Sequence, residues 1–134
     1  DQMVLNFPIL ADYSIFPVGN RLIYATHGHV YNTAHLPPLC PGDILLHGHT
    51  HVPAWEPFGE ENLYLNPGSV SIPKNGSARG YLTLEDGVFQ WKTLSGDVYH
   101  TLTLQYGAYT QQKQASHRTR SMGSLLSVCR FIRP

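Results

Sequence analysis

Short runs of β-forming residues, each ended by a turn signal, do most to constrain the fold of this 134-residue chain. The dipeptides Gly19-Asn20, Asp86-Gly87 and Ser95-Gly96 separate such runs, and glycine-containing dipeptides of this kind favour tight hairpin turns. The expected strands cover residues 13–18, 21–26, 43–47, 54–58, 63–65, 81–84, 88–93 and 98–104. Only residues 32–40 leave room for a short helix, which two prolines limit to about one turn. The pattern predicts a mostly β domain.

The charged residues divide the chain into two unlike parts. Residues 1–104 hold four Lys and Arg against nine Asp and Glu, whereas residues 105–134 hold five basic residues and no acidic one. The second part is rich in Gln, Ser and Arg and has no sustained hydrophobic periodicity. We therefore predict one domain at 1–104, followed by a basic polar tail at 105–134 that is disordered or unrelated to the domain, with a functional basic arm as the alternative.

The overall balance of charge and hydropathy bears on partners and location. A formal net charge of zero argues against binding to nucleic acid or to an anionic membrane surface. No apolar run approaches the roughly 18–20 residues of a transmembrane helix. We therefore expect a cytoplasmic protein with neither a nucleic-acid nor a membrane partner.

Histidine is the residue type that points to chemistry. Five of the eight histidines follow or end the expected strands at 21–26 and 43–47, namely His27, His29, His47, His49 and His51. Because ligands gather where neighbouring strands end, we expect these imidazoles at one edge of a sheet. Neutral imidazole binds zinc, manganese, iron and nickel well, so the spacing predicts a metal site without ranking the five. The remaining histidines are expected to be solvated surface residues: His35, His100 and His117.

Three motifs in the sequence resemble those of one enzyme family, both in their residues and in their order along the chain. They are Thr26-His27-Gly28-His29, residues 45–53 (LLHGHTHVP) and residues 66–74 (NPGSVSIPK). Together they resemble the YfcE-type phosphodiesterases of the calcineurin-like metallophosphoesterase superfamily, and the resemblance covers residues 1–104. It implies an α/β (α+β) sandwich of two β-sheets flanked by helices, of which the part present here is mostly β.

The resemblance also implies roles for individual residues. His27 and His49 correspond to ligands of one metal ion, and His51 corresponds to a ligand of a second ion. His29 and His47 correspond to neighbours of the ligands. The Asn-Pro-Gly-Ser motif, which includes Asn66, Gly68 and Ser69, corresponds to a structural turn beneath the site. The family's two ions are divalent, with manganese the first expectation and nickel, zinc or iron the alternatives.

The reaction that the resemblance implies is metal-dependent hydrolysis of a small-molecule phosphoester, either a phosphodiester, as in a phosphodiesterase, or a phosphomonoester. Two ions about 3.5–4 Å apart can polarise phosphoryl oxygens and activate a water molecule. The family's opening motifs, which are Asp-x-His, a Gly-Asp that closes a strand and Gly-Asn-His/Cys-Asp, do not occur in this sequence. These motifs supply the carboxylate that bridges the ions. We therefore interpret the chain as the C-terminal half of such an enzyme, which by itself holds at most one ion weakly.

Two other functions remain open at this stage. A non-catalytic remnant or scaffold with the same fold would keep these motifs without hydrolysing a substrate. A cupin-like metal protein would instead combine His49 and His51 with Glu56, in a His-x-His…Glu arrangement. If the chain is half of a two-sheet domain, its strand edges and apolar faces are exposed, which predicts homo-oligomerisation or other association.

Overall fold

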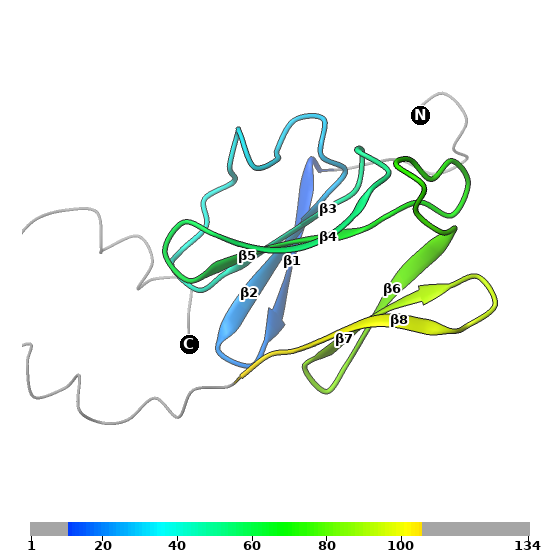
Figure 1. Ribbon diagram of the computed structural model, residues 1–134. Coiled ribbons are helices and arrows are strands. Elements are labelled where there is room, and N and C mark those ends of the chain that lie inside the picture. Colours follow the sequence, from blue (N-terminus) through cyan, green and yellow to red (C-terminus); the bar gives the residue numbers. More distant parts are fainter. Residues whose placement is uncertain (1–10, 106–134) are drawn as a thin grey trace, which may run out of the picture. The chain divides into compact units, whose positions relative to one another are not determined.

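The computed structural model describes residues 11–105, which form strands joined by turns and loops (Figure 1). The strands are β1 (Tyr13–Val18), β2 (Arg21–Thr26), β3 (Ile44–His47), β4 (Pro53–Phe58), β5 (Asn62–Pro67), β6 (Gly80–Glu85), β7 (Val88–Thr93) and β8 (Val98–Thr103). No helix occurs within residues 11–105, so none there could span a membrane, and residues 32–40 form bends rather than the helical turn that the sequence left open. Apart from Gln105, the predicted tail lies outside the described residues.

The larger sheet has five strands in the order β1-β2-β3-β5-β4. Strands β2, β3 and β5 run parallel to one another, and the hairpins β1-β2 and β4-β5 add an antiparallel strand at each side. The β1-β2 turn is the predicted Gly19-Asn20, because Val18 pairs with Arg21 and Gly19 has a φ of 57°. The sequence therefore identified the hairpin, and the parallel pairings place the ends of β2 and β3 together.

The smaller sheet is an antiparallel meander of β6, β7 and β8. Its first turn is the predicted Asp86-Gly87, and both residues have positive φ angles of 48° and 76°, as a two-residue hairpin turn of type I′ requires. An irregularity between Trp91 and Lys92 interrupts the β7-β8 register. The hairpin signals therefore predicted both turns of this sheet.

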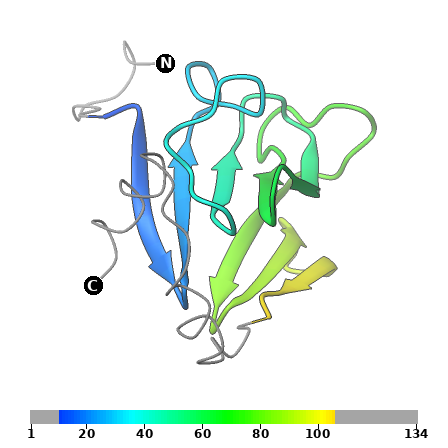
Figure 2. The same ribbon diagram turned by 90° about the vertical axis from the view of Figure 1, so that its left-hand side faces the viewer.

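The core lies where the inner faces of the two sheets meet (Figure 2). Its buried members are Ile23, Ile44 and Leu65 from the larger sheet, and Phe89, Trp91 and Leu104 from the smaller sheet and the segment that follows it. The indole nitrogen of Trp91 donates a hydrogen bond of 2.7 Å to the backbone oxygen of Asn66. This bond ties the smaller sheet to the end of β5.

A buried carboxylate organises the opposite end of the parallel strands. Asp43 is fully buried directly before β3, where its Oδ1 accepts the N–H of Leu22 at 3.0 Å and its Oδ2 accepts the N–H of Cys40 at 2.9 Å. The side chain of Asn62 donates to the backbone oxygen of Asp43 at 3.0 Å. Gly42-Asp43 therefore begins a strand and joins the starts of β2, β3 and β5.

His100 differs from its predicted role as a solvated residue. It is half-buried, and its ring stacks on Trp55 with centroids 3.7 Å apart and planes 12° apart. Trp91 meets both rings edge-on, each at a centroid distance of 5.2 Å. Because β4 belongs to one sheet and β8 to the other, this aromatic cluster joins the two sheets.

Candidate metal site

The parallel pairing of β2 and β3 brings two histidine-bearing loops together. Thr26, the last residue of β2, pairs with His47, the last residue of β3. The chain therefore leaves the sheet at adjacent points, through His27 and Gly28 on one side and through Gly48 and His49 on the other. This is the shared sheet edge that the sequence predicted.

Two of the predicted ligands face each other at this edge. The Nε2 atom of His27 lies 3.2 Å from the Nδ1 atom of His49, and the ring centroids are 5.1 Å apart. Both side chains are exposed to solvent. His49 adopts a left-handed backbone with a φ of 64°, which turns its ring toward His27 and costs about 1–3 kcal/mol for a residue with a side chain.

Gly28 makes this close approach sterically feasible. It is buried, has a φ of 112°, and a Cβ placed there would lie 2.7 Å from His47 Nδ1 and 2.9 Å from the Cβ of His49. No side chain fits such a gap, and the backbone conformation itself favours glycine. Gly28 therefore lets the two loops lie against each other.

The surroundings of His27 favour its neutral form. Desolvation is the main cause that lowers the pKa of His27 below its ordinary value of 6.5, followed by the neighbouring imidazoles of His49 and His29. His29 lies beside His27, with ring centroids 5.2 Å apart. A neutral imidazole is the form that binds metal, so the clustering favours the ligand state of His27.

His51, the third predicted ligand, has a different partner. Its Nδ1 lies 2.7 Å from the backbone oxygen of Ile72, and its own backbone oxygen accepts the N–H of Lys74 at 3.2 Å. Like His49, it has a left-handed backbone, with a φ of 65°. No contact joins its ring to the His27–His49 pair, although His51 is close enough to lower the pKa of His27 slightly.

His47 lies beneath the pair. It is 4% exposed and stacks on Tyr64 with ring centroids 4.5 Å apart, and its Nδ1 lies 3.0 Å from the oxygen of Gly48. Because a carbonyl oxygen only accepts, Nδ1 carries the hydrogen and Nε2 carries a lone pair, which has no partner among the described residues. His47 thus lies against the loop that carries His49, and its role beside a metal ligand stays a prediction.

The Asn-Pro-Gly-Ser turn lies against the second histidine loop. The Nδ2 atom of Asn66 is within 3.0 Å of Gly48 O, Thr50 Oγ1 and Tyr64 Oη, and its Oδ1 accepts the N–H of Gly68 at 2.9 Å. Ser69 Oγ accepts the backbone N–H groups of Ser71 and Ile72. The sequence missed Tyr64 and the Ile72 carbonyl, because neither belongs to a motif with metal-ligand spacing.

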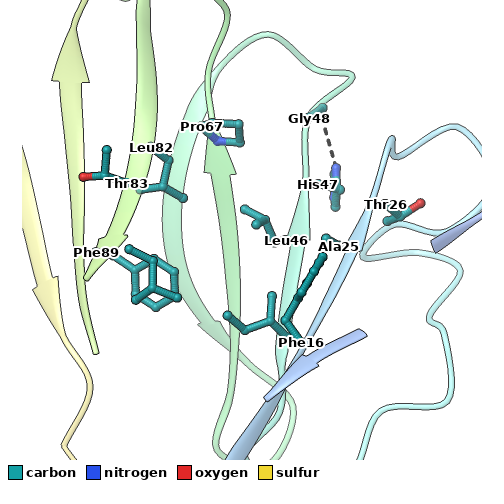
Figure 3. A pocket seen from close by; sticks show the side chains of 12 residues that line it. Phe16, Ala25, Thr26, Leu46, His47, Gly48, Pro67, Leu82, Thr83 and Phe89 are labelled. Atoms are coloured by element: carbon teal, nitrogen blue, oxygen red, sulfur yellow. Dashed lines mark hydrogen bonds between the residues drawn. The ribbon is translucent and has the colours of Figure 1, made fainter. Parts of the chain in front are cut away.

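A pocket of about 470 Å³ lies on the inner side of these loops (Figure 3). Thr26, His47 and Gly48 line it at the histidine end, and most of its remaining wall is apolar, with Phe16, Leu46, Leu82 and Phe89. The side chain of Phe16 is 52% exposed. The pocket therefore leaves an open, mostly apolar face between the two sheets.

The distance between the facing nitrogens of His27 and His49 is one that two ligands of a single ion can have. Two imidazole nitrogens 3.2 Å apart, each about 2.1 Å from one ion, would subtend about 100° at it, between tetrahedral and octahedral angles. Within residues 11–105, however, no three His, Cys, Asp or Glu side chains form a group that could hold an ion. The pair fits two ligands of one ion, and assignment of His27, His49 and His51 as a complete ligand set stays a prediction.

Comparison with known proteins agrees with the motifs and the fold. Residues 5–86 match the calcineurin-like phosphoesterase superfamily domain. The chain is 43% identical over 88 residues to the phosphodiesterase YfcE of Escherichia coli K12, and equally to that of strain O157:H7, a match that covers 66% of this chain and 47% of the relative. The chain thus spans about half the length of the curated relatives it matches.

Comparison of the fold with solved structures indicates the same family. The solved structure of YfcE, a phosphoesterase from E. coli, superposes with a TM-score of 0.68 at 35% identity, over 78% of this chain and 57% of that one. The two strand-rich layers described above are therefore those of a metallophosphoesterase sandwich, and the flanking helices implied by the family do not occur within residues 11–105. This protein belongs to the calcineurin-like phosphoesterase superfamily.

Proposed function

We propose that this chain supplies the histidine ligands of a divalent-metal-dependent phosphodiesterase site. In this proposal His27 and His49 bind one ion, and His51 contributes to a second ion. The substrate is a small-molecule phosphodiester. The single observation that carries the proposal is the convergence of His27 Nε2 and His49 Nδ1 to 3.2 Å at the ends of adjacent parallel strands.

The chemistry of the pair supports a metal rather than an acid-base role. The two nitrogens face each other, so without an ion one of them carries a hydrogen and donates a hydrogen bond to the other. Desolvation, followed by nearby imidazoles, lowers the pKa of His27, which favours the neutral ring that can bind a cation. A bound Mn²⁺, or alternatively Ni²⁺, Zn²⁺ or Fe²⁺, would polarise a phosphoryl oxygen and lower the pKa of bound water.

The rest of the proposed site comes from polypeptide other than the described residues. Asp43 is buried at the opposite end of β3 and accepts two backbone N–H groups, so it is not available as a bridging ligand. The family's carboxylate motifs have no counterpart in the sequence. We propose that a metallophosphoesterase segment bearing those carboxylates completes a dinuclear centre in the intact cytoplasmic enzyme.

A chimera tests this proposal directly. Residues 1–104 would replace the matching stretch of E. coli YfcE, and Mn²⁺-stimulated hydrolysis of bis(p-nitrophenyl) phosphate would be measured. We expect hydrolysis that is lost in the His49→Ala chimera and kept in the His35→Ala chimera, since His35 lies apart from the pair and contacts Tyr31 and Val30. A folded chimera with no metal-stimulated hydrolysis would contradict the proposal.

The same experiment separates the alternatives. A folded chimera that binds Mn²⁺ without turnover would favour the non-catalytic scaffold. The cupin-like alternative has lost its support, because the chain belongs to another superfamily and Glu56 is exposed on β4, where it pairs with Tyr64 of β5.

We also propose that the chain alone self-associates. Among the described residues β1 and β4 form the unpaired edges of the larger sheet, and Phe16 and Leu84 at the pocket are 52% and 41% exposed. Exposed edges and apolar patches favour association. Sedimentation of the isolated chain should reveal dimers or larger species, and Phe16→Asp should shift the distribution toward monomer. A wild-type chain that remains monomeric at high concentration would refute this.

A further inference from the structure

We propose that the turn containing Asn66 and Ser69 positions His49 and His51 relative to each other. It does so through two separate series of hydrogen bonds, which are called chains of hydrogen bonds below. This inference rests on the proposed function, in which both imidazoles serve the metal site. Neither residue contacts an imidazole nitrogen directly, so both are positioning residues.

The first chain of hydrogen bonds acts on the backbone around His49. Asn66 is fully buried, and its Nδ2 lies 3.0 Å from the oxygen of Gly48 and 2.9 Å from Oγ1 of Thr50. These two acceptors flank His49 on either side. Because His49 has a left-handed backbone that a residue with a side chain adopts only at a cost, its surroundings must hold it there. Asn66 supplies part of that restraint.

The position of Asn66 is itself well determined. Its Oδ1 accepts the N–H of Gly68 at 2.9 Å, and its backbone oxygen accepts the indole N–H of the fully buried Trp91 at 2.7 Å. Asn66 thus connects the histidine loop, through its side chain, to the core shared by the two sheets, through its backbone oxygen. A rigid anchor of this kind is what a precise ligand position requires.

The second chain of hydrogen bonds acts on the ring of His51. Ser69 Oγ accepts the backbone N–H of Ile72 at 3.0 Å, and the oxygen of Ile72 lies 2.7 Å from His51 Nδ1. Since a carbonyl oxygen cannot donate, Nδ1 must carry the hydrogen and the neutral ring presents its lone pair at Nε2. The oxygen of Ile72 therefore selects the tautomer of His51, and Ser69 holds the backbone of Ile72 in place through its N–H.

Both chains of hydrogen bonds start within four residues of one turn. Asn66 and Ser69 are joined through Pro67 and Gly68, so a displacement of this turn would move the backbone at His49 and the acceptor for His51 together. The partners that orient metal-bound histidines typically affect metal affinity by about 10–100-fold when they are changed. The Asn-Pro-Gly-Ser motif thereby has a function in the site besides reversing the chain.

The test compares substitutions within the loop. In the metal-free 134-residue chain, long-range ¹H–¹⁵N spectra of the imidazoles report which nitrogen of His51 carries the hydrogen. We expect the Nδ1-protonated form in wild type, a mixture of both tautomers in Ser69→Ala, and recovery in Ser69→Thr, which restores a hydroxyl. Ser71→Ala is the matched control, because its hydroxyl forms no hydrogen bond within the described part of the chain.

Mn²⁺ titration of the same variants in the chimera with E. coli YfcE provides the second readout, because the ion assigned to His51 needs ligands that the isolated chain lacks. Affinity should fall about tenfold in Ser69→Ala and return in Ser69→Thr. Thr50→Val, which removes one acceptor of Asn66 at an exposed position, should also weaken binding and disturb the resonances of His49. A folded Ser69→Ala chain with the wild-type tautomer of His51 would overturn the positioning role. Wild-type protein that shows the expected tautomers but no Mn²⁺ binding would instead refute the proposed metal site.

Discussion

The Nε2 atom of His27 lies 3.2 Å from the Nδ1 atom of His49, although 22 positions separate the two residues in sequence. Two features bring them together, the parallel pairing that places Thr26 beside His47 and the absence of a side chain at Gly28. The pair is therefore a product of strand register and of one close backbone approach. Its geometry leads to predictions that do not depend on the whole enzyme.

The first prediction concerns the metal affinity of the isolated chain. His27→Ala should lower Mn²⁺ affinity at least tenfold, because changes to residues that merely support a ligand already cost about 10–100-fold. His35→Ala should leave it unchanged. Isothermal titration calorimetry at pH 7.5 would measure both, and equal affinity in wild type and His27→Ala would show that the pair does not bind the ion.

The second prediction concerns Gly28. An alanine there would strain the backbone, at about 1–3 kcal/mol, and would force His47 and His49 away from the loop after β2. We expect lower stability in urea together with weaker Mn²⁺ binding. Gly96→Ala is the matched control, because its φ of 95° imposes similar strain while no atom lies within 4 Å of the added Cβ. A loss of stability without a loss of affinity in Gly28→Ala would contradict the steric explanation.

The third prediction concerns the pH dependence of stability. Burial is the main cause that lowers the pKa of His47 below 6.5, assisted by His49 and His27 and opposed by the hydrogen bond to Gly48. The unfolded chain therefore binds more protons than the folded chain as the pH falls below 6.5. The free energy of unfolding should be fully retained above that pH and decrease as the pH falls toward the lowered pKa.

His47→Phe tests this effect, since phenylalanine keeps a ring against Tyr64 without a titrating group. Urea unfolding between pH 7.5 and 5 should show a shallower decrease for this variant than for wild type. Some decrease should remain, because the pKa of His27 is lowered as well. Identical slopes for wild type and His47→Phe would mean that His47 does not contribute.

The fourth prediction concerns Asp43. Its replacement by alanine removes the carboxylate acceptor of the part-buried backbone N–H groups of Leu22 and Cys40, and a fully buried group would lose about 1–3 kcal/mol, which is an upper limit for each. Asp97→Ala, in an exposed turn where the carboxylate bonds to Ser95, should cost less. Chemical denaturation would compare the two, and equal losses would argue against the structural role of Asp43.

Much of the fold was predictable because its determinants are local. Gly19-Asn20 and Asp86-Gly87 mark hairpins through backbone angles that few residues adopt, and the structure has both turns where the sequence placed them. Apolar runs between such turns identified the strands to within a few residues. The helical turn considered for residues 32–40 did not form, and in the loop found there Asn32 Oδ1 accepts the backbone N–H groups of Ala34 and His35.

Contacts between distant residues were less predictable. His100 looked like a solvated residue because nothing near it in sequence is unusual, yet it stacks on Trp55 from the other sheet. The oxygen of Ile72 carries no sequence signature at all, since every residue has a carbonyl group, and only the path of the loop makes it the partner of His51.

The sequence by itself determined the superfamily, the strand ends that carry the histidines, and the turns that join the strands, because short motifs and local backbone preferences are sufficient for these. The tertiary structure decided that His27 faces His49, that His51 instead bonds to Ile72, and that His47 is buried with Nε2 unpartnered among the described residues. The physical reason is that the imidazoles of His27 and His49 meet only when strand register, a glycine without a Cβ at position 28 and a left-handed backbone at His49 combine. Local sequence preferences alone do not produce that combination.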